Sequence, residues 1–207
     1  MDRKIRILIV DDHPLMRSGI SVEINAEPDM EVVAAAEDGL EALELFRRHR
    51  PEVSLIDLRM PKMNGLDLIT TIRADCPVAK MIVLTSSAGD VHALRALRAG
   101  AVGYLLKHML RDELISTIRD VHNGKRRIPD DIAQLVAKNA IEGQMTPREI
   151  EVLNQVAKGH SNKQISAFLF ISEYTVKDHI KTILAKLGAQ DRTHAVAIAV
   201  QRGFIDL

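Results

Sequence analysis

The chain has a single cysteine, Cys76, among its 207 residues. One thiol cannot form an intramolecular disulfide, and it excludes a metal site built from a cysteine cluster. Apolar runs are also short, since none approaches the roughly 18 residues of a membrane-spanning helix. The first residues read as a short strand rather than as the apolar core of a signal peptide. We therefore expect a cytoplasmic protein, in agreement with a reducing compartment.

A net charge is missing as well, because 28 Lys and Arg residues balance 28 Asp and Glu residues. The balance shifts along the chain: residues 1–122 hold 16 basic and 19 acidic residues, whereas residues 145–207 hold 8 and 6. This asymmetry is too mild to predict nucleic-acid binding by itself. Such a prediction has to rest on where individual charges lie.

Five strand-like apolar runs occur in the first 122 residues, and each is followed by a segment with helical spacing. The runs cover Ile5–Val10, Glu31–Ala36, Val53–Ile56, Lys80–Leu84 and Val102–Leu106. Buried strands that alternate with helices predict an α/β, doubly wound domain with a five-stranded parallel sheet. Ligands of such sheets bind at the carboxyl ends of the strands.

The pattern changes after this first domain. Gly124 and Pro129 mark a linker, which we place at residues 123–144 with room for one helix near residues 130–139. From Met145 onward the pattern contains short helices and no strand-like run. The sequence thus predicts a small all-α second domain at residues 145–207.

Four N-cap signals define the helices of this second domain. They are Thr146 and Ser161, each in a capping box, together with Ser172 and Asp191. Only Phe170-Ile171 separates the second helix from the cap of the third. Such a short turn indicates a helix-turn-helix.

Polar residues stand at the ends of four strands of the first domain: Asp11 and Asp12, Asp57, Thr85 and Lys107. Crowded carboxylates repel one another unless a cation joins them, and a set of oxygen ligands favours Mg²⁺. A lysine opposite them would neutralise an incoming phosphoryl group. One carboxylate would then be available as a nucleophile that forms an acyl phosphate.

In order and spacing, this set resembles the receiver domain of two-component response regulators over residues 4–122. The resemblance implies a flavodoxin-like fold, a sensor histidine kinase as partner, and Asp57 as the phosphoacceptor. It implies a Mg²⁺ site formed by Asp11, Asp12, Asp57 and the backbone carbonyl of Arg59. Thr85 and Lys107 would contact the phosphoryl oxygens, and Tyr104 falls at the position of an aromatic switch that turns inward when the threonine moves.

Each of these residues also has a plainer interpretation when taken singly. An aspartate at a strand end often caps a helix, Thr85 simply ends a strand, and Tyr104 is a half-buried core ring. The joint placement of the set favours the phosphorylation site. His13, which follows the acidic pair, we interpret as a bystander rather than as a metal ligand.

The third helix of the second domain has two distinct faces. Val176, Ile180, Ile183 and Leu187 share one buried stripe. Lys177, Asp178 and Lys181 then lie on the other face, near the end that a recognition helix presents to base edges. Flanking phosphates would be bound by Tyr174, Thr175, Lys163 and Arg192. The alternative is an ordinary solvated lysine face.

Residues 145–207 resemble the LuxR-type helix-turn-helix of the NarL/FixJ regulators, through Thr146-Pro147-Arg148-Glu149, Ser161-Asn162-Lys163 and Thr175-Val176-Lys177 among other motifs. In that family the counterparts of Lys177, Asp178 and Lys181 face the bases. An acidic residue at position 178 departs from the frequent small apolar residue, and it would either accept from a cytosine amino group or repel phosphate.

The resemblance favours a homodimer through the last helix, at residues 192–202, that reads a repeat of half-sites. The small residues of this helix, which are Ala195, Val196, Ala199 and Val200, equally suit core packing.

Together these features predict a response regulator in which Asp57 phosphorylation controls sequence-specific DNA binding and transcription. Beyond catalysing its own phosphotransfer and dephosphorylation, it would not be an enzyme. A Mg²⁺-dependent phosphatase with an aspartyl-phosphate intermediate is the enzymatic alternative, but it needs an aspartate where the chain has Arg59. The same residues would also suit a regulator that binds DNA constitutively, or a receiver that binds only a protein partner.

Overall fold

The computed structural model describes residues 4–86, 90–130, 132–134 and 145–205. The chain divides into two compact units, one of residues 1–87 and 93–130, the other of residues 88–92 and 131–207. Most of the segment for which we predicted a linker helix lies outside the described residues. Among the described helices, none combines the length and the apolar character needed to cross a bilayer.

The first unit is built on a five-stranded parallel sheet with the order β2-β1-β3-β4-β5. Its strands are β1 (Ile5–Val10), β2 (Met30–Ala36), β3 (Val53–Asp57), β4 (Met81–Thr85) and β5 (Gly103–Leu106). The predicted strands are confirmed to within one residue at each end. Since β2 lies on one side of β1 and β3 on the other, the strand order reverses between β1 and β3. Doubly wound sheets bind their ligands at such a switch point.

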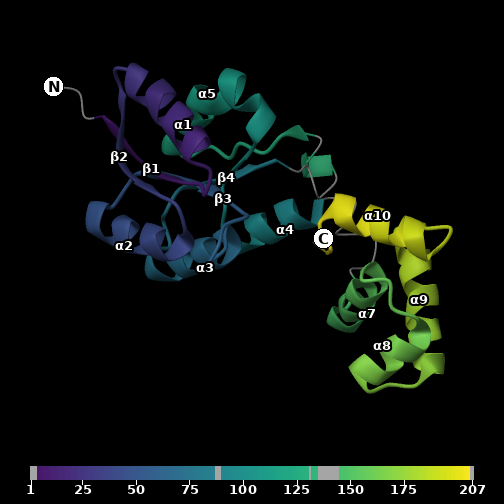
Figure 1. Cartoon of the computed structure of the whole chain (residues 1–207). Coiled ribbons are helices and arrows are strands. Elements are labelled where there is room, and N and C mark those ends of the chain that lie inside the picture. Colours follow the sequence, from purple (N-terminus) through teal and green to yellow (C-terminus); the bar gives the residue numbers. More distant parts are fainter. Residues whose placement is uncertain (1–3, 87–89, 131, 135–144, 206–207) are drawn as a thin grey trace. The chain divides into compact units, whose positions relative to one another are not determined.

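Helices cover both faces of this sheet (Figure 1). One face carries α1 (Pro14–Ala26) and α5 (Leu110–His122), and the other carries α2 (Gly39–His49), α3 (Gly65–Asp75) and α4 (Asp90–Ala99). A short 3-10 turn at Lys107–Met109 leads from β5 into α5. Because helices shield both faces, four consecutive residues of β1, at positions 7–10, are fully buried. The predicted doubly wound α/β class is confirmed.

A short segment after α5 adds to the edge of the sheet. Arg127 forms an isolated parallel bridge with Gly103. The Tyr104 amide donates to the Arg127 carbonyl at 2.8 Å, and the Arg127 amide donates to the Val102 carbonyl at 3.0 Å. The first unit therefore extends beyond residue 122, where the sequence placed the end of the first domain.

The described residues of the second unit form four longer helices, α7 (Pro147–Ala157), α8 (Asn162–Leu169), α9 (Glu173–Leu187) and α10 (Arg192–Arg202). All four predicted N-caps are confirmed, because the side chains of Thr146, Ser161, Ser172 and Asp191 each accept from a backbone amide three residues ahead. The first two form complete capping boxes. Local side-chain chemistry thus sets where each helix begins.

The apolar stripe of α9 is the centre of the second core. Val176, Ile183 and Leu187 are buried, and the partly buried Ile180 packs against the same core. The core also takes Ala195 and Ala199 from α10, while Val196 and Val200 are partly buried against it. Core packing is therefore the observed role of the two alanines.

The turn between α8 and α9 is tight. Phe170 ends α8 in the left-handed conformation, with φ of 53°, and Ser172 already caps α9. A guanidinium nitrogen of Arg148 donates to the Leu169 carbonyl at 2.6 Å, which ties the end of α8 to α7. These contacts fix the angle at which the chain enters α9.

An ion pair between the buried Glu149 and the half-buried Lys186 joins α7 to α9. Glu149 Oε2 accepts from Lys186 Nζ at 2.7 Å and from the Thr146 amide at 2.6 Å. Burial acts to raise the pKa of Glu149, but the hydrogen bonds from Lys186 and Thr146 outweigh it and hold the pKa below its ordinary value. A carboxyl group with a lowered folded-state pKa stabilises the fold above its unfolded pKa, and this stability is lost as the pH falls through the folded pKa.

We expect Glu149→Gln to lower the free energy of unfolding at neutral pH by about 1–3 kcal/mol, because the ion pair between Glu149 and Lys186 is lost. The variant should also lose part of the fall in stability that the wild type shows below about pH 4.3. Thermal unfolding followed by circular dichroism over this pH range measures both effects. The control is Glu151→Gln, which removes a surface ion pair with Arg148 and should cost less than about 1 kcal/mol. An unchanged pH profile in Glu149→Gln would contradict the role of this ion pair.

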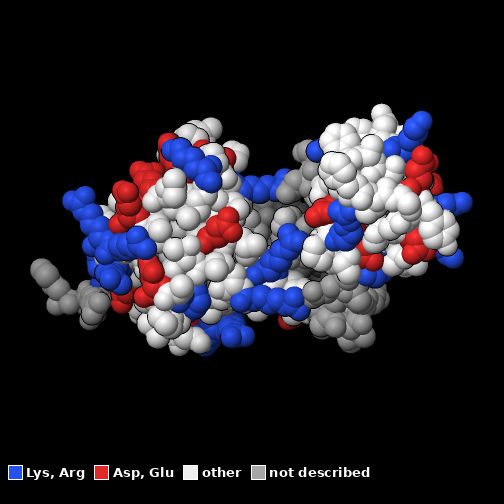
Figure 2. Space-filling model, turned by 90° about the horizontal axis from the view of Figure 1, so that it is seen from below, with Lys and Arg blue, Asp and Glu red and all other residues white. Residues whose placement is uncertain are grey.

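Figure 2 shows the charged side chains on one face of the molecule. On the face that Figure 2 shows, acidic and basic side chains are interspersed with uncharged ones. Nucleic-acid binding therefore has to be argued from particular side chains.

Candidate functional site

A group of carboxylates gathers at the switch point of the sheet. Val10 of β1 pairs with Ile56 of β3, so the next residues, Asp11 and Asp57, lie level with each other. Asp12 follows directly at the same edge. The parallel register of two neighbouring strands thus brings the acidic residues together.

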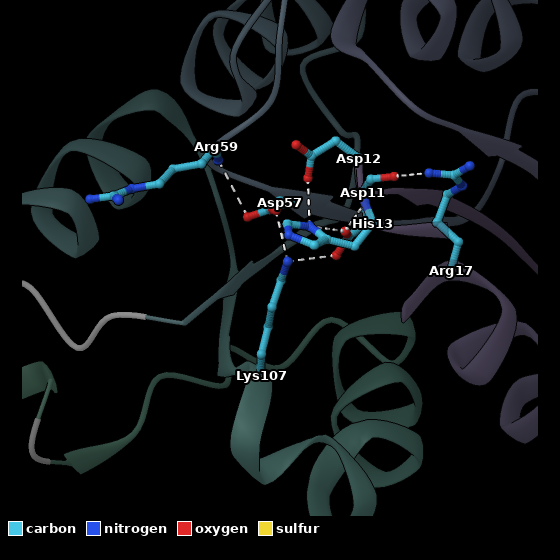
Figure 3. A network of polar contacts seen from close by, with 7 residues as sticks. All are labelled: Asp11, Asp12, His13, Arg17, Asp57, Arg59 and Lys107. Carbon is cyan, nitrogen blue, oxygen red and sulfur yellow. Dashed lines mark hydrogen bonds and ion pairs between the residues drawn. The ribbon is translucent and has the colours of Figure 1, made fainter. Parts of the chain in front are cut away.

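Lys107 lies between two of these carboxylates (Figure 3). Its Nζ atom is 2.7 Å from Asp57 Oδ2 and 2.7 Å from Asp11 Oδ2. The side chains of Asp11, Asp57 and Lys107 are only 0%, 6% and 9% exposed. The β4–β5 register explains this position, because Leu106 pairs with Thr85 at the end of β4 and Lys107 comes next.

The electrostatics of this group favour an additional cation. Burial raises the pKa of Asp57, and the hydrogen bond from Lys107 offsets this only in part. Burial also disfavours the charge on Lys107, but its close contacts with Asp11 and Asp57 raise its pKa above the ordinary value. One ammonium group therefore faces two buried carboxylates, with Asp12 beside them.

The donor atoms fit a hard divalent cation. Ligand atoms of Asp11, Asp12, His13 and Asp57 all lie within 4.8 Å of one another. Asp11 Oδ2 and Asp12 Oδ1 have no partner with hydrogen-bond geometry, although Lys107 and His13 approach them to 2.7 Å. Buried oxygens with lone pairs to offer are the ligands that Mg²⁺ and similar ions prefer.

Two residues at the start of α1 contact the site: Arg17, which was not predicted to do so, and His13, which we interpreted as a bystander. Arg17 donates to the Asp11 carbonyl at 2.5 Å, and the His13 amide donates to Asp11 Oδ1 at 2.9 Å. His13 Nδ1 lies 2.7 Å from Asp12 Oδ1. Pro14 is the sequence feature that could have indicated these contacts, because proline is common in the first turn of a helix. A helix that begins directly after Asp11 and Asp12 places its first turn next to these carboxylates.

The remaining predicted residues of this domain lie around the carboxylates. Thr85 is the buried last residue of β4. Tyr104 in β5 is 1% exposed, so its ring points into the interior rather than into solvent. The Arg59 amide donates to Asp57 Oδ1 at 3.3 Å, while its side chain extends away from the carboxylates (Figure 3).

Several close contacts fix the loop that joins β3 to α3, directly after Asp57. Lys62 Nζ pairs with Asp38 Oδ2 at 2.5 Å, and Asp38 caps α2. The Gly65 amide donates to the Leu58 carbonyl at 3.1 Å. A Cβ atom on Gly65 would lie 2.0 Å from the Asp57 carbonyl oxygen, so this close approach requires glycine.

We expect Gly65→Ala to lower the free energy of unfolding by about 1–3 kcal/mol, because the backbone at Asp57 or α3 must move. The matched control is Gly19→Ala in α1, where, apart from the neighbouring backbone of α1 itself, nothing lies within 4 Å of the added Cβ. That control should be neutral or stabilising by up to about 1 kcal/mol. Urea unfolding of both variants measures the difference, and equal stabilities would contradict the close approach.

In the second unit, the outward face of α9 carries the residues predicted to read DNA. Lys177, Asp178 and Lys181 are exposed, opposite the buried stripe of the same helix. Tyr174, in the first turn of α9, is also strongly exposed. The predicted division of α9 into a buried and a polar face is confirmed.

The predicted phosphate-binding residues differ in their surroundings. Lys163 is exposed in the first turn of α8. Thr175 is half-buried, and its Oγ1 lies 2.8 Å from Ser172 Oγ within the helix cap. Arg192 donates a hydrogen bond to the His160 carbonyl at 2.7 Å. One nitrogen of its guanidinium group is therefore engaged within the domain. No local pattern indicates this contact, because it joins residues 32 positions apart.

Two protein families match this chain. Residues 7–119 match the response regulator receiver domain, and residues 143–199 match the bacterial regulatory proteins of the luxR family. The first match alone spans more than half of the chain. Apart from residues 88–92, the first matched range lies in the first structural unit, and the second range lies in the second unit.

Individual relatives match nearly the whole chain. The nitrate/nitrite response regulator protein NarP of Escherichia coli (strain K12) is 38% identical, with 95% of each chain covered. The transcriptional regulatory protein DegU of Brevibacillus brevis is 35% identical, with 99% of this chain and 96% of DegU covered. A solved structure of two RcsB dimers bound to two parallel DNAs is 25% identical, with a TM-score of 0.72 and coverage of 96% of this chain and 99% of RcsB.

The family matches and the relatives agree with the two units of the structure. A five-stranded receiver fold carries the carboxylates, and the helical unit carries the helix-turn-helix. The chain therefore belongs to the NarL/FixJ family of response regulators, transcription regulators that join a receiver domain to a LuxR-type DNA-binding domain.

Proposed function

We propose that a sensor histidine kinase phosphorylates Asp57 in the presence of Mg²⁺, and that this modification controls sequence-specific DNA binding and transcription. The observation that carries the proposal is the position of Lys107 Nζ, 2.7 Å from both Asp57 and Asp11. We assign residues 4–122 to the receiver domain, 123–144 to the linker, whose Arg127 pairs with the edge of the receiver sheet, and 145–207 to the DNA-binding domain. The family matches at residues 7–119 and 143–199 support this division.

The residues of the site have separate roles in phosphoryl transfer. Mg²⁺ would be held by Asp11, Asp12, the Asp57 carboxylate and the backbone carbonyl of Arg59. When bound, the ion supplies positive charge opposite the phosphoryl oxygens. An Asp57 carboxylate oxygen forms the new bond to phosphorus while the bond from phosphorus to the kinase histidine breaks. Lys107 stays protonated, in keeping with its raised pKa, and neutralises the transferred group.

We assign the switch to Thr85 and Tyr104. Thr85 would contact the phosphoryl oxygens and move toward them, and the Tyr104 ring would occupy the space behind it. This rearrangement alters the surface of the fourth and fifth βα units. It then acts on the output domain either by uncovering α9 or by favouring a homodimer.

In the DNA complex, α9 would lie in the major groove with Lys177, Asp178 and Lys181 toward the bases. Flanking phosphates would be bound by Tyr174, Thr175, Lys163 and Arg192. The RcsB structure with dimers on DNA supports a homodimer that reads a repeat of half-sites. A regulator of this kind works where the chromosome lies, which supports a cytoplasmic location.

We propose no further chemistry than phosphotransfer to Asp57 and the dephosphorylation of this residue. A phosphatase with an aspartyl-phosphate intermediate needs a general acid two residues after the nucleophile. That position is Arg59, whose side chain extends away from the carboxylates (Figure 3). Steady turnover of phosphate esters is therefore not expected.

Genomic footprinting of the full chain tests this function. With Mg²⁺ and a small-molecule phosphodonor, we expect protected sites that contain repeated half-sites, with much weaker protection without the donor. Equal protection in both conditions would favour a constitutive DNA-binding regulator. A complete lack of protection would favour a receiver that acts only on a protein partner.

A further inference from the structure

His13 occupies the N-cap position of α1, but its side chain does not cap the helix. The imidazole turns instead toward the acidic pair, where Nδ1 lies 2.7 Å from Asp12 Oδ1 and 3.2 Å from Asp11 Oδ1 (Figure 3). The side chain is 69% exposed, so packing does not force it into this position. The contacts of the ring nitrogen therefore need a chemical explanation.

An ordinary hydrogen bond explains these contacts only in part. Nδ1 has hydrogen-bond geometry toward Asp11 Oδ1, but Asp12 Oδ1 has no hydrogen-bond partner although Nδ1 is closer to it. Two ligands that sit at right angles around one ion, with bonds of about 2.0–2.2 Å, lie about 2.8–3.1 Å apart. The two Nδ1 distances lie close to this edge length.

We propose that His13 Nδ1 is a further ligand of the receiver metal site for divalent transition ions that bind imidazole, such as Co²⁺. This inference rests on the proposed function, which places a divalent ion at the same carboxylates. Mg²⁺ prefers oxygen ligands, whereas imidazole suits the later first-row ions, whose affinity for a given site increases from Mn²⁺ to Ni²⁺. His13 therefore determines how strongly the site prefers a transition ion over Mg²⁺.

The neighbouring donors fit this role. Asp11 and Asp12 supply one carboxylate each within reach of Nδ1, and the ligand atom of Asp57 belongs to the same group within 4.8 Å. Because Nδ1 faces the carboxylates, the other ring nitrogen carries the proton when the ion is bound. The exposure of the ring leaves that N–H accessible to solvent.

The ratio of the Co²⁺ and Mg²⁺ dissociation constants, measured by calorimetry on the untagged full chain, tests the proposal. In His13→Asn we expect the preference for Co²⁺ over Mg²⁺ to fall about tenfold or more, the scale on which lost metal-site groups act. His108→Asn is the matched control, since His108 is an exposed histidine next to Lys107. The control should keep the wild-type ratio, and an unchanged ratio in His13→Asn would overturn the proposal.

Paramagnetic NMR of the Co²⁺-loaded chain gives a second, direct readout. A coordinated imidazole gives a strongly shifted, exchangeable ring N–H signal, which we expect in the wild type and in His108→Asn but not in His13→Asn. Persistence of this signal in His13→Asn would assign it to another histidine and overturn the proposal. Asp12→Ala should weaken binding of both ions. If the wild type binds neither ion at this site, the proposed Mg²⁺ site itself fails, which is a different outcome from a bound ion without nitrogen ligation.

Discussion

Asp57→Asn is expected to lower phosphoryl incorporation from a small-molecule donor at least about a thousandfold, to the background level. The amide that replaces the carboxylate is not a nucleophile, while the side chain keeps nearly the same size and position. Asp11 and Lys107 remain in place to pair with each other, so the fold should persist. Intact-protein mass spectrometry after incubation with donor and Mg²⁺ measures the incorporation directly.

Glu44→Gln provides the matched control for this prediction. It also replaces one carboxylate by an amide, but at an exposed position of α2. We expect it to accept one phosphoryl group as the wild type does. Full incorporation into Asp57→Asn would assign the phosphoacceptor to another residue and remove the basis of the proposed mechanism.

The double variant Lys177→Ala/Lys181→Ala is expected to lower the affinity for a footprinted site at least about thirtyfold. Each side chain on the outward face of α9 would contact a base edge, and such contacts contribute about 1–3 kcal/mol each. The buried stripe of α9 is untouched by these changes, so the domain should keep its stability. Fluorescence anisotropy with labelled operator DNA at fixed salt measures the loss.

Lys158→Ala is the control for the charge alone, because Lys158 is exposed and lies outside α9. Lys158→Ala should lower the DNA affinity much less than either Lys177→Ala or Lys181→Ala alone. Binding to unrelated DNA should also fall less than operator binding in the α9 variants, since base contacts specify while phosphate contacts position. Equal losses of operator affinity in Lys158→Ala, Lys177→Ala and Lys181→Ala would favour an ordinary solvated lysine face on α9 that makes no base contacts.

Local patterns were sufficient to predict most of the fold. The strands β1, β3, β4 and β5 are almost entirely buried and therefore read as continuous apolar runs, and the apolar run of the edge strand β2 was long enough to locate it as well; all five were located to within one residue. The caps of the four C-terminal helices depend on side chains within three residues of each helix start, such as Thr146 with Glu149. The acidic cluster was also foreseeable, because parallel strands end at one edge of the sheet.

Contacts between distant residues were beyond the reach of such patterns. The Arg127 bridge to β5 consists of a single residue pair, which leaves no periodic signal. Arg192 donates a hydrogen bond to the His160 carbonyl, and Lys186 pairs with Glu149. Both contacts depend on how the helices pack rather than on local sequence spacing. For the same reason, the sequence left the role of Ala195 and Ala199 open until their burial was seen.

Identification of the modified residue tests the central claim most directly. Borohydride reduces an acyl phosphate of aspartate to homoserine, which marks the site permanently for peptide mass spectrometry. After treatment of the full chain with phosphodonor and Mg²⁺, the account predicts homoserine at position 57, and none when Mg²⁺ is removed by a chelator. Homoserine at another carboxylate, or an unmodified Asp57 after full donor treatment, would contradict it.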